Sequence, residues 1–307
     1  MGTIKEIVHE QCTGCGACYN KCPHNAIRME YDSEGFIFPV IEDSLCVDCG
    51  LCLNICPVEN PLEFHPTPAS YAVMASDEIR RVSSSGGMFT LLANEILAKG
   101  GMVCGAVYSP DYLTVYHDWA KYETELAPLR GSKYVQSETR LTYRETKQYL
   151  DKGKTVLYTG CPCQIAGLYR YLGKEYENLY TADLVCHGSN SVSAYHSFLH
   201  EYSDGKEIEK VDFRDKVFYS WSTPTVVYLK DGSVKKDAWD KGNWYKGFLE
   251  GVINRLNCYE CPYARSERIA DITMADCWQV YRLNKAYDDR IGTSLVLVNS
   301  PKGKILF

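Results

Sequence analysis

One cysteine pattern occurs twice in the first part of the chain. The first run is "CTGCGACYNKCP" at Cys12–Pro23, and the second is "CVDCGLCLNICP" at Cys46–Pro57. Each run is C-x-x-C-x-x-C-x-x-x-C and ends in proline. A 4Fe-4S cluster needs four thiolates around one small volume. The first three cysteines of such a run surround one cluster, and the fourth binds the other cluster. The pattern therefore predicts two clusters that exchange their fourth ligands.

This assignment defines two predicted cluster sites. The first site consists of Cys12, Cys15, Cys18 and Cys56. The second site consists of Cys46, Cys49, Cys52 and Cys22. Zinc is less suitable, because zinc sites usually combine separate C-x-x-C pairs rather than runs of four cysteines. Disulfides are disfavoured, because they belong to secreted proteins and the N-terminal "MGTIKEIVHE" lacks the apolar core of a signal peptide.

On these two runs, residues 1–62 resemble a bacterial-type ferredoxin domain with two 4Fe-4S clusters. The resemblance implies a module that carries electrons one at a time. The following segment Pro57–Ser70, "PVENPLEFHPTPAS", is rich in proline and has no hydrophobic periodicity. It predicts a linker, assigned to residues 63–70, that forms a stiff and extended spacer. A second domain is expected over residues 71–307.

The composition limits the compartment and the partners. Hydrophobic residues make up 45% and charged residues 23% of the chain, which is typical of soluble globular proteins. The net charge of −6 gives no basis for a nucleic-acid partner, and no apolar run reaches the length of a membrane span. Fifteen cysteines without an export signal indicate metal ligation in a reducing cytosol. We therefore expect a cytoplasmic protein, in an anaerobic host because oxygen damages such clusters.

The part after the linker alternates between strand-like and helix-like segments. Strands are expected over residues 70–76, 101–109, 154–160 and 179–186, and helices over residues 87–100, 137–153, 164–173 and 189–202. This order predicts an α/β domain with a mostly parallel sheet, so that the whole chain is of the α+β or α/β class. "TPTVVYLKDGSVKKDAW" at Thr223–Trp239 predicts a smaller C-terminal hairpin region that turns at Asp231 and Gly232.

Four further cysteines predict a third metal site. Cys163 follows one predicted strand, and Cys186 ends the next. The C-terminal ends of neighbouring parallel strands share one edge of the sheet, so these two cysteines are expected to lie close together. Cys258 and Cys261 add a C-x-x-C pair. Spacing alone favours neither a 4Fe-4S cluster nor a structural zinc ion here, and a redox dithiol of Cys161 and Cys163 is a further alternative.

Six phrases follow one another after the linker. They are "SSSGGMFTLLANEIL", "YTGCPCQIAGLYRYLG", "DLVCHGSNS", "VDFRDK", "CYECPYARSERIADITMADCW" and "GTSLVLVNSPKG". In this order they resemble the beta-subunit family of coenzyme F420 hydrogenases and dehydrogenases. Together with the ferredoxin module, the resemblance covers almost the whole chain. It implies FAD beside a 4Fe-4S cluster, and therefore favours a cluster over zinc at the third site.

The chain departs from the usual pattern of this family at one position. Members usually have threonine before Pro-Cys-Gln, whereas this chain has Cys161. Cys163 therefore matches the family's ligand, and Cys161 is additional. Family members are also usually longer at the C-terminus, so we expect that this sequence is a fragment.

Three segments are candidates for contacts to the FAD that the resemblance implies. "SSSGG" opens a predicted helix and could hold the pyrophosphate at the helix N-terminus, although a simple serine cap explains it equally. "GSKYVQS" offers a positive charge and ring or ribose contacts, or is merely a polar loop. "YTG" ends the strand before the third site, which would place flavin and cluster side by side. The candidate residues are Ser85, Gly86, Gly87, Lys133, Tyr134, Gln136, Thr159 and Gly160.

Three charged or titratable residues complete the candidates. His187 is a possible catalytic proton donor near the flavin, and the alternative is a hydrogen-bond partner behind the ligand Cys186. Arg214 and Lys216 in "VDFRDK" could bind an anionic substrate, or could be solvated surface residues.

These features predict an iron-sulfur flavoprotein oxidoreductase. It would move electrons between ferredoxin or another carrier and a small-molecule redox substrate, which is F420 or another hydride acceptor or donor. Two clusters, a third cluster and FAD are the expected cofactors. The alternative is a non-catalytic electron-transfer subunit that connects other redox subunits of a larger complex.

Overall fold

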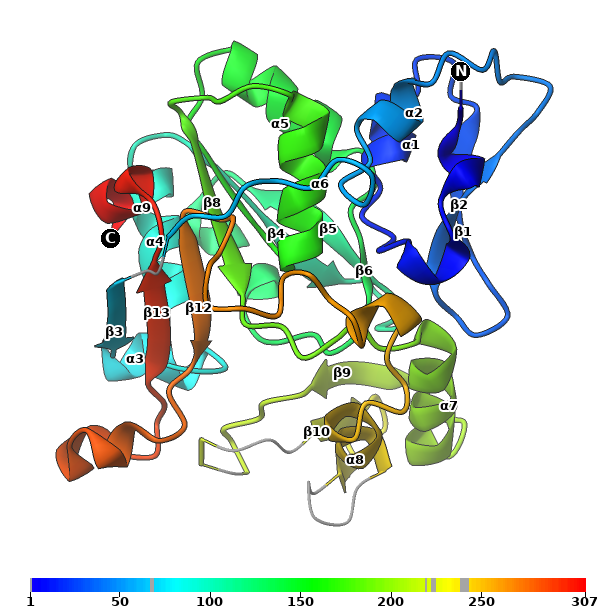
Figure 1. The fold of residues 1–307 in the computed structure, drawn as a ribbon. Coiled ribbons are helices and arrows are strands. Elements are labelled where there is room, and N and C mark those ends of the chain that lie inside the picture. Colours follow the sequence, from blue (N-terminus) through cyan, green and yellow to red (C-terminus); the bar gives the residue numbers. More distant parts are fainter. Residues whose placement is uncertain (1, 67–68, 219, 222–224, 238–242) are drawn as a thin grey trace.

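A computed structural model describes residues 2–66, 69–218, 220–221, 225–237 and 243–307 (Figure 1). Within these residues a central eight-stranded sheet has the order β3-β13-β12-β8-β7-β4-β5-β6. In that order, its strands are Ala69–Val73, Ser294–Val298, Ile272–Asp276, Leu179–Leu184, Val156–Gly160, Met102–Tyr108, Val115–Ala120 and Ser137–Glu138. Strands β12, β8, β7 and β4 run parallel to one another, and β6 runs parallel to β5. The pairs β3 with β13, β13 with β12, and β5 with β4 are antiparallel. The predicted mostly parallel sheet is therefore confirmed.

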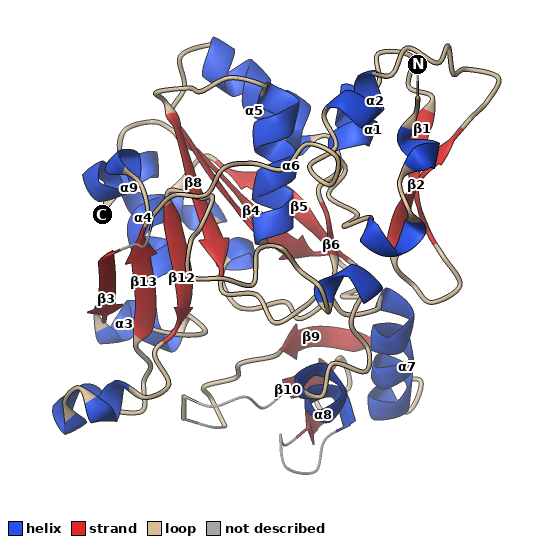
Figure 2. Cartoon of the chain, viewed as in Figure 1, coloured by secondary structure: helices blue, strands red, loops and turns tan. Residues whose placement is uncertain are grey.

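Helices cover both faces of this sheet, as Figure 2 shows. One face carries α4 (Met88–Ala98) and α9 (Pro301–Leu306), and the other carries α5 (Thr142–Asp151) and α6 (Pro162–Leu172). A further short helix, α3, spans Asp77–Arg81. Successive residues of a strand point to opposite faces of the sheet and so contribute to the two hydrophobic cores, one on each face. Leu157 of β7 packs with the α4 side, whereas Tyr158 packs with the α6 side.

A smaller lobe follows β8 and lies below the sheet in the view of Figure 1. It contains α7 (Val192–Ser203), β9 (Ile208–Asp212), β10 (Thr225–Leu229), β11 (Val234–Asp237) and α8 (Asn243–Leu249). The predicted hairpin is confirmed over its described residues, because β10 pairs with β11 across Asp231 and Gly232. Strand β9 pairs with the other edge of β10 and was not expected from the sequence.

Several element boundaries differ from the prediction. The helix expected over residues 137–153 begins only at Thr142, because Ser137–Glu138 forms β6 and pairs with β5. Strands β5 and β12 were not expected. The residues after β13 form a helix, α9, and the Ser300 hydroxyl caps it by accepting a hydrogen bond from the Gly303 amide.

The N-terminal cysteine-rich domain consists of α1 (Ala17–Lys21), the hairpin β1 (Ile27–Tyr31) and β2 (Ile37–Ile41), and α2 (Leu51–Asn54). It packs beside α5 and α6 at one end of the sheet (Figure 1). Arginine side chains of the α/β domain bind its backbone. Arg144 Nε donates to the Asn20 carbonyl at 2.6 Å, and Arg170 Nε donates to the Asn60 carbonyl at 2.5 Å.

The proline-rich segment does not span a gap between the domains. Its described part lies against the α/β domain, where the His65 amide donates to the Arg268 carbonyl at 2.7 Å. The Phe64 ring also lies 6.1 Å from the Tyr263 ring, centroid to centroid. The stiff, extended spacer stays a prediction, and these backbone and ring contacts hold its described part against the α/β domain. Residues 67 and 68 of the expected linker lie outside the described residues.

Candidate iron-sulfur and flavin site

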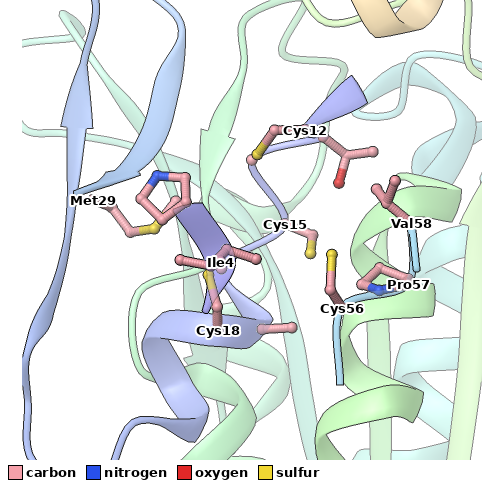
Figure 3. A pocket seen from close by; sticks show the side chains of 13 residues that line it. Ile4, Cys12, Cys15, Cys18, Met29, Cys56, Pro57 and Val58 are labelled. Carbon is pink, nitrogen blue, oxygen red and sulfur yellow. The ribbon is translucent and has the colours of Figure 1, made fainter. Parts of the chain in front are cut away.

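The structure brings the four cysteines of the first site around one cavity (Figure 3). Cys12 and Cys15 lie in the loop before α1, Cys18 lies in α1, and Cys56 arrives from the segment after α2. Apolar side chains complete the lining, namely Ile4, Met29, Pro39 and Val58. Burial raises the pKa of the Cys15 thiol to about 12, so a metal must displace protons to bind here.

A second cavity collects the second site. It is lined by Cys22 from the first run together with Cys46, Cys49 and Cys52 from the second. Cys49 is exposed and Cys46 is half-buried, whereas Cys12 is the one half-buried cysteine of the first site and its other three cysteines are buried. The second site is therefore the more accessible of the two. In each cavity the fourth cysteine comes from the other run, which is the arrangement predicted, and ligation itself stays a prediction.

The third group of cysteines meets at the C-terminal edge of the sheet. Cys163 lies in the first turn of α6, directly after β7, and Cys186 lies two residues beyond the end of β8. Cys258 ends a 3-10 turn at Leu256–Cys258, and Cys261 follows it. Burial is the largest cause of a raised pKa at Cys163, and the charges of Cys186, Cys258 and Cys261 raise this pKa further. The four predicted ligands are therefore electrostatic neighbours.

Two loops are paired beneath this third site. The Arg255 amide donates to the Ser189 carbonyl at 2.9 Å, and the Ser189 amide points at the Cys258 Sγ at 3.4 Å. Gly188 has φ +141°, and a Cβ there would lie 2.4 Å from the side-chain Nδ2 of Asn254. A glycine is therefore required for the loops that carry Cys186 and Cys258 to approach each other.

Cys161 also belongs to this neighbourhood. Its Sγ lies 3.9 Å from the Cys186 Sγ, and its side chain caps the N-terminus of α6. Among the described residues, no three histidine, cysteine, aspartate or glutamate side chains gather tightly enough to hold a single ion. In this part of the chain the thiols are therefore neighbours that do not converge on one point.

The first and third sites are adjacent across the domain boundary. Cys163 and Cys261 pack against the same hydrophobic cluster that contains Cys15. Tyr263 belongs to the same cluster, where burial raises the pKa of its phenol and Cys163, Cys15, Cys261 and Cys56 raise it further. The backbone of the N-terminal domain is fixed there, because Tyr143 Oη is 2.8 Å from the Cys15 carbonyl.

The residues predicted to contact FAD lie on several elements. Ser85, Gly86 and Gly87 precede α4, where the Ser85 hydroxyl donates to the Thr293 carbonyl at 3.0 Å and the Gly86 amide donates to the Ser294 hydroxyl at 3.0 Å. These contacts hold the loop before α4 against β13. Thr159 and Gly160 instead end β7, and the Thr159 hydroxyl donates to the Cys104 carbonyl at 2.9 Å.

Tyr134, Gln136 and His187 have structural partners of their own. The Tyr134 ring packs against Phe248, with centroids 4.9 Å apart. Gln136 is buried at the domain boundary, where its Oε1 accepts a hydrogen bond from the Ile37 amide at 3.3 Å. His187 is exposed, and its Nε2 lies 3.3 Å from the Leu249 carbonyl. Contacts of these residues to a flavin stay predictions, and Gln136 has a second role between the domains.

Positive charge collects around the serine loop. Lys133 Nζ donates to the Pro128 and Arg130 carbonyls at 2.8 Å, and burial lowers its pKa to about 7. Lys216 Nζ donates to the Ser85 carbonyl at 3.1 Å, and burial lowers its pKa to about 8. Neither ammonium group forms an ion pair within the described residues. Both would gain from a bound anion.

Arg214 differs from these two lysines. It is buried and forms a two-point ion pair with Asp276, at 2.7 and 3.2 Å, while also donating to the Ser84 carbonyl at 3.1 Å. Its charge is thus already compensated. The surface alternative for Arg214 is wrong, because Asp276 and the serine loop enclose the side chain.

Sequence reasoning missed Arg255, Tyr263 and Gly167. A glycine inside the predicted helix "QIAGLYRYLG" was a usable signal, because such a glycine often marks a close approach. Arg255 and Tyr263 lie close to Cys258 and Cys261 in sequence, but nothing in their spacing indicates that they face the N-terminal domain.

Comparison with known families agrees with this arrangement. Residues 153–307, just over half of the chain, match the family described as the C terminus of the beta subunit of coenzyme F420 hydrogenase/dehydrogenase. The chain belongs to this family. Residues 11–60 match a 4Fe-4S dicluster domain. The chain is thus an iron-sulfur electron-transfer member of the F420 hydrogenase/dehydrogenase beta-subunit family, a family of oxidoreductase subunits.

A solved structure supports the fold of this family member. It is a chain of the F420-reducing [NiFe] hydrogenase complex from Methanosarcina barkeri, with 18% identity and a TM-score of 0.53. The similarity covers 80% of this chain and 78% of that chain. A search among curated proteins gave no match. In the part of this family member that the structure describes, no helix is long and apolar enough to cross a membrane.

Proposed function

We propose that the chain is an iron-sulfur flavoprotein oxidoreductase. It would exchange electrons with a ferredoxin-type carrier through the N-terminal domain, and with F420 or another small hydride acceptor or donor through the α/β domain. The observation that carries this proposal is the contact between the first site and the third site across α6. Electron exchange between the domains needs such closeness.

The donor sets fit 4Fe-4S clusters at all three sites. Four cysteines line each N-terminal cavity, and four more come together at the sheet edge. When bound, each cluster would accept and release one electron at a time. The protein's own residues would exclude water with Ile4, Met29 and Val58, and would fix the ligand loops through backbone hydrogen bonds to Ser189 and Arg255.

The charge at the serine loop supports FAD in the α/β domain. Lys133 and Lys216 are held by carbonyl oxygens, and the N-terminus of α4 lies in the same region, so an anionic dinucleotide would be stabilised there. Bound FAD would supply hydride transfer and single-electron exchange. The hydroxyls of Ser84 and Ser85 already have protein partners, so we assign the attraction to the lysines rather than to the serines.

An anaerobic reduction assay tests this function. Reconstituted protein would be mixed with reduced F420, NADH or NADPH as the small-molecule donor, and reduction of added oxidised ferredoxin would be followed by absorbance. We expect one of the donors to support turnover that depends on added FAD. A protein that exchanges electrons with ferredoxin but binds no flavin and uses no small-molecule donor would instead be an electron-transfer subunit of a larger complex.

A further inference from the structure

Arg255 is a buried cation between the first and third sites. It is only 2% exposed. Its Nε donates to the carbonyl of Cys12, a predicted ligand of the first site, at 2.7 Å. Its own carbonyl accepts from the amide of Cys258, a predicted ligand of the third site, at 2.9 Å. One residue therefore contacts the backbone at a ligand of each site.

The charge of Arg255 has no carboxylate partner among the described residues. Other buried arginines do have one, since Arg214 pairs with Asp276 and Arg268 pairs with Asp183. The Nη2 of Arg255 is buried without a hydrogen-bond partner in the part of the chain that the structure describes. An isolated buried charge is costly, so compensation must come from groups nearby.

The groups near Arg255 that can supply this compensation are an aromatic ring, cysteine thiolates and, more weakly, the carboxylate of Asp32. The Phe38 ring lies 3.8 Å from the guanidinium carbon, which provides a cation–π contact. The negative groups that interact most strongly with the guanidinium are Cys12, Cys163 and Cys258. These cysteines belong to the first and third sites, and none belongs to the second.

We propose that Arg255 sets the reduction potentials of the first and third sites together. This inference rests on the proposed function, because it assumes redox clusters at these cysteines. A site with four thiolates is rich in negative charge, and each added electron makes it more negative. A fixed cation in a buried, low-dielectric position lowers the energy of that electron at both sites. Arg255 thereby raises the reduction potentials of the two neighbouring sites together. Its effect on the reduction potential of the more distant second site is smaller.

Two other arginines at the domain boundary show what a purely structural role looks like. Arg144 and Arg170 also donate to carbonyls of the N-terminal domain, but both are only half-buried. Solvent screens their charges, so they are expected to hold the domains together without tuning either site. Arg170 provides a matched control, because its Nε binds the Asn60 carbonyl rather than a carbonyl of a predicted ligand.

The test is an EPR-monitored redox titration of the full chain after anaerobic reconstitution. In Arg255→Gln the first and third sites should both become harder to reduce, by about tenfold in the one-electron equilibrium or about 59 mV. The second site should move less, and Arg170→Gln should leave all potentials in place. Unchanged potentials at the first and third sites in Arg255→Gln would overturn the proposal.

A second variant keeps the test decisive if Arg255→Gln does not fold. Gln136 Oε1 lies 3.4 Å from Arg255 Nη1, so Gln136→Glu retains the acceptor and adds a negative charge beside the guanidinium. It should shift the first and third sites in the same negative direction, and no shift would contradict the role of Arg255. If the third site held zinc, its redox signal would be missing and the proposed function would fail there, while the shift at the first site would still decide the role of Arg255.

Discussion

Gly167 of α6 lies so close to Cys15 of the N-terminal domain that no side chain fits between them. A Cβ on Gly167 would lie 3.0 Å from the Cys15 Sγ and 2.9 Å from the Tyr143 Oη. Glycine inside a helix costs about 0.5–1 kcal/mol relative to alanine. The close approach explains why a glycine is present, and Cys163 lies one helical turn earlier on the same side of α6.

The Gly167→Ala variant should therefore be destabilised, although alanine is the better helix former. Overpacking a buried contact costs about 1–3 kcal/mol, which exceeds the gain in helix propensity. The control is Gly247→Ala in α8, where a Cβ would meet Ile253 at an ordinary 3.6 Å. Thermal unfolding should show a lower midpoint for Gly167→Ala and an unchanged or higher one for Gly247→Ala. A gain of stability in both variants would contradict the close packing.

Serine substitutions distinguish the ligands of the third site from Cys161. Replacing Cys163, Cys186, Cys258 or Cys261 should remove one EPR signal and about four irons, because each is a predicted cluster ligand. Cys161→Ser should keep the iron, since serine can also cap α6. Iron analysis and EPR of each variant provide the measurement. Loss of iron in Cys161→Ser with retention in Cys163→Ser would move the ligand assignment to Cys161.

His117 should make the protein sensitive to acid. It is buried, its Nε2 lies 3.0 Å from the Thr159 carbonyl, and burial lowers its pKa to about 4. In the unfolded chain the imidazole of His117 binds a proton near pH 6.5. The stability that the neutral, buried ring contributes to the folded chain is therefore fully present above that pH. It is lost as the pH falls from about 6.5 towards 4.

Thermal midpoints at pH 7 and pH 5 test this expectation. The drop between the two values should be smaller in His117→Gln than in the wild type. His196→Gln is the control, because His196 is exposed. Equal drops in all three proteins would show that other groups, such as the carboxylates, account for the whole pH dependence.

Binding of FAD should weaken as the pH rises. The pKa values of Lys133 and Lys216, about 7 and about 8, mean that both ammonium groups lose their protons between pH 6.5 and 9. An anionic ligand favours the charged form, so binding above these pKa values requires proton uptake. Quenching of FAD fluorescence would measure the Kd at each pH. In Lys133→Met with Lys216→Met the affinity should be lower and independent of pH, and an unchanged pH profile would remove the lysines from the site.

The sequence allowed more of the metal chemistry to be predicted than of the domain arrangement. Ligand spacing is local, so the cysteine runs alone predicted both N-terminal sites. The closeness of Cys163 and Cys186 was predicted because the C-terminal ends of neighbouring parallel strands share one edge of the sheet. The contact of Gly167 with Cys15 and the position of Arg255 depend on long-range packing. The same packing gives Gln136 a place between the domains and fixes the predicted spacer through His65 and Phe64.

The most direct test of the account is a metal analysis of the anaerobically reconstituted full chain. Three clusters of four irons predict about twelve irons and about twelve inorganic sulfides per chain, with no stoichiometric zinc. Saturation at about eight irons with one zinc would mean that Cys163, Cys186, Cys258 and Cys261 hold a structural ion. That result would contradict electron exchange between the N-terminal domain and the α/β domain through a third cluster.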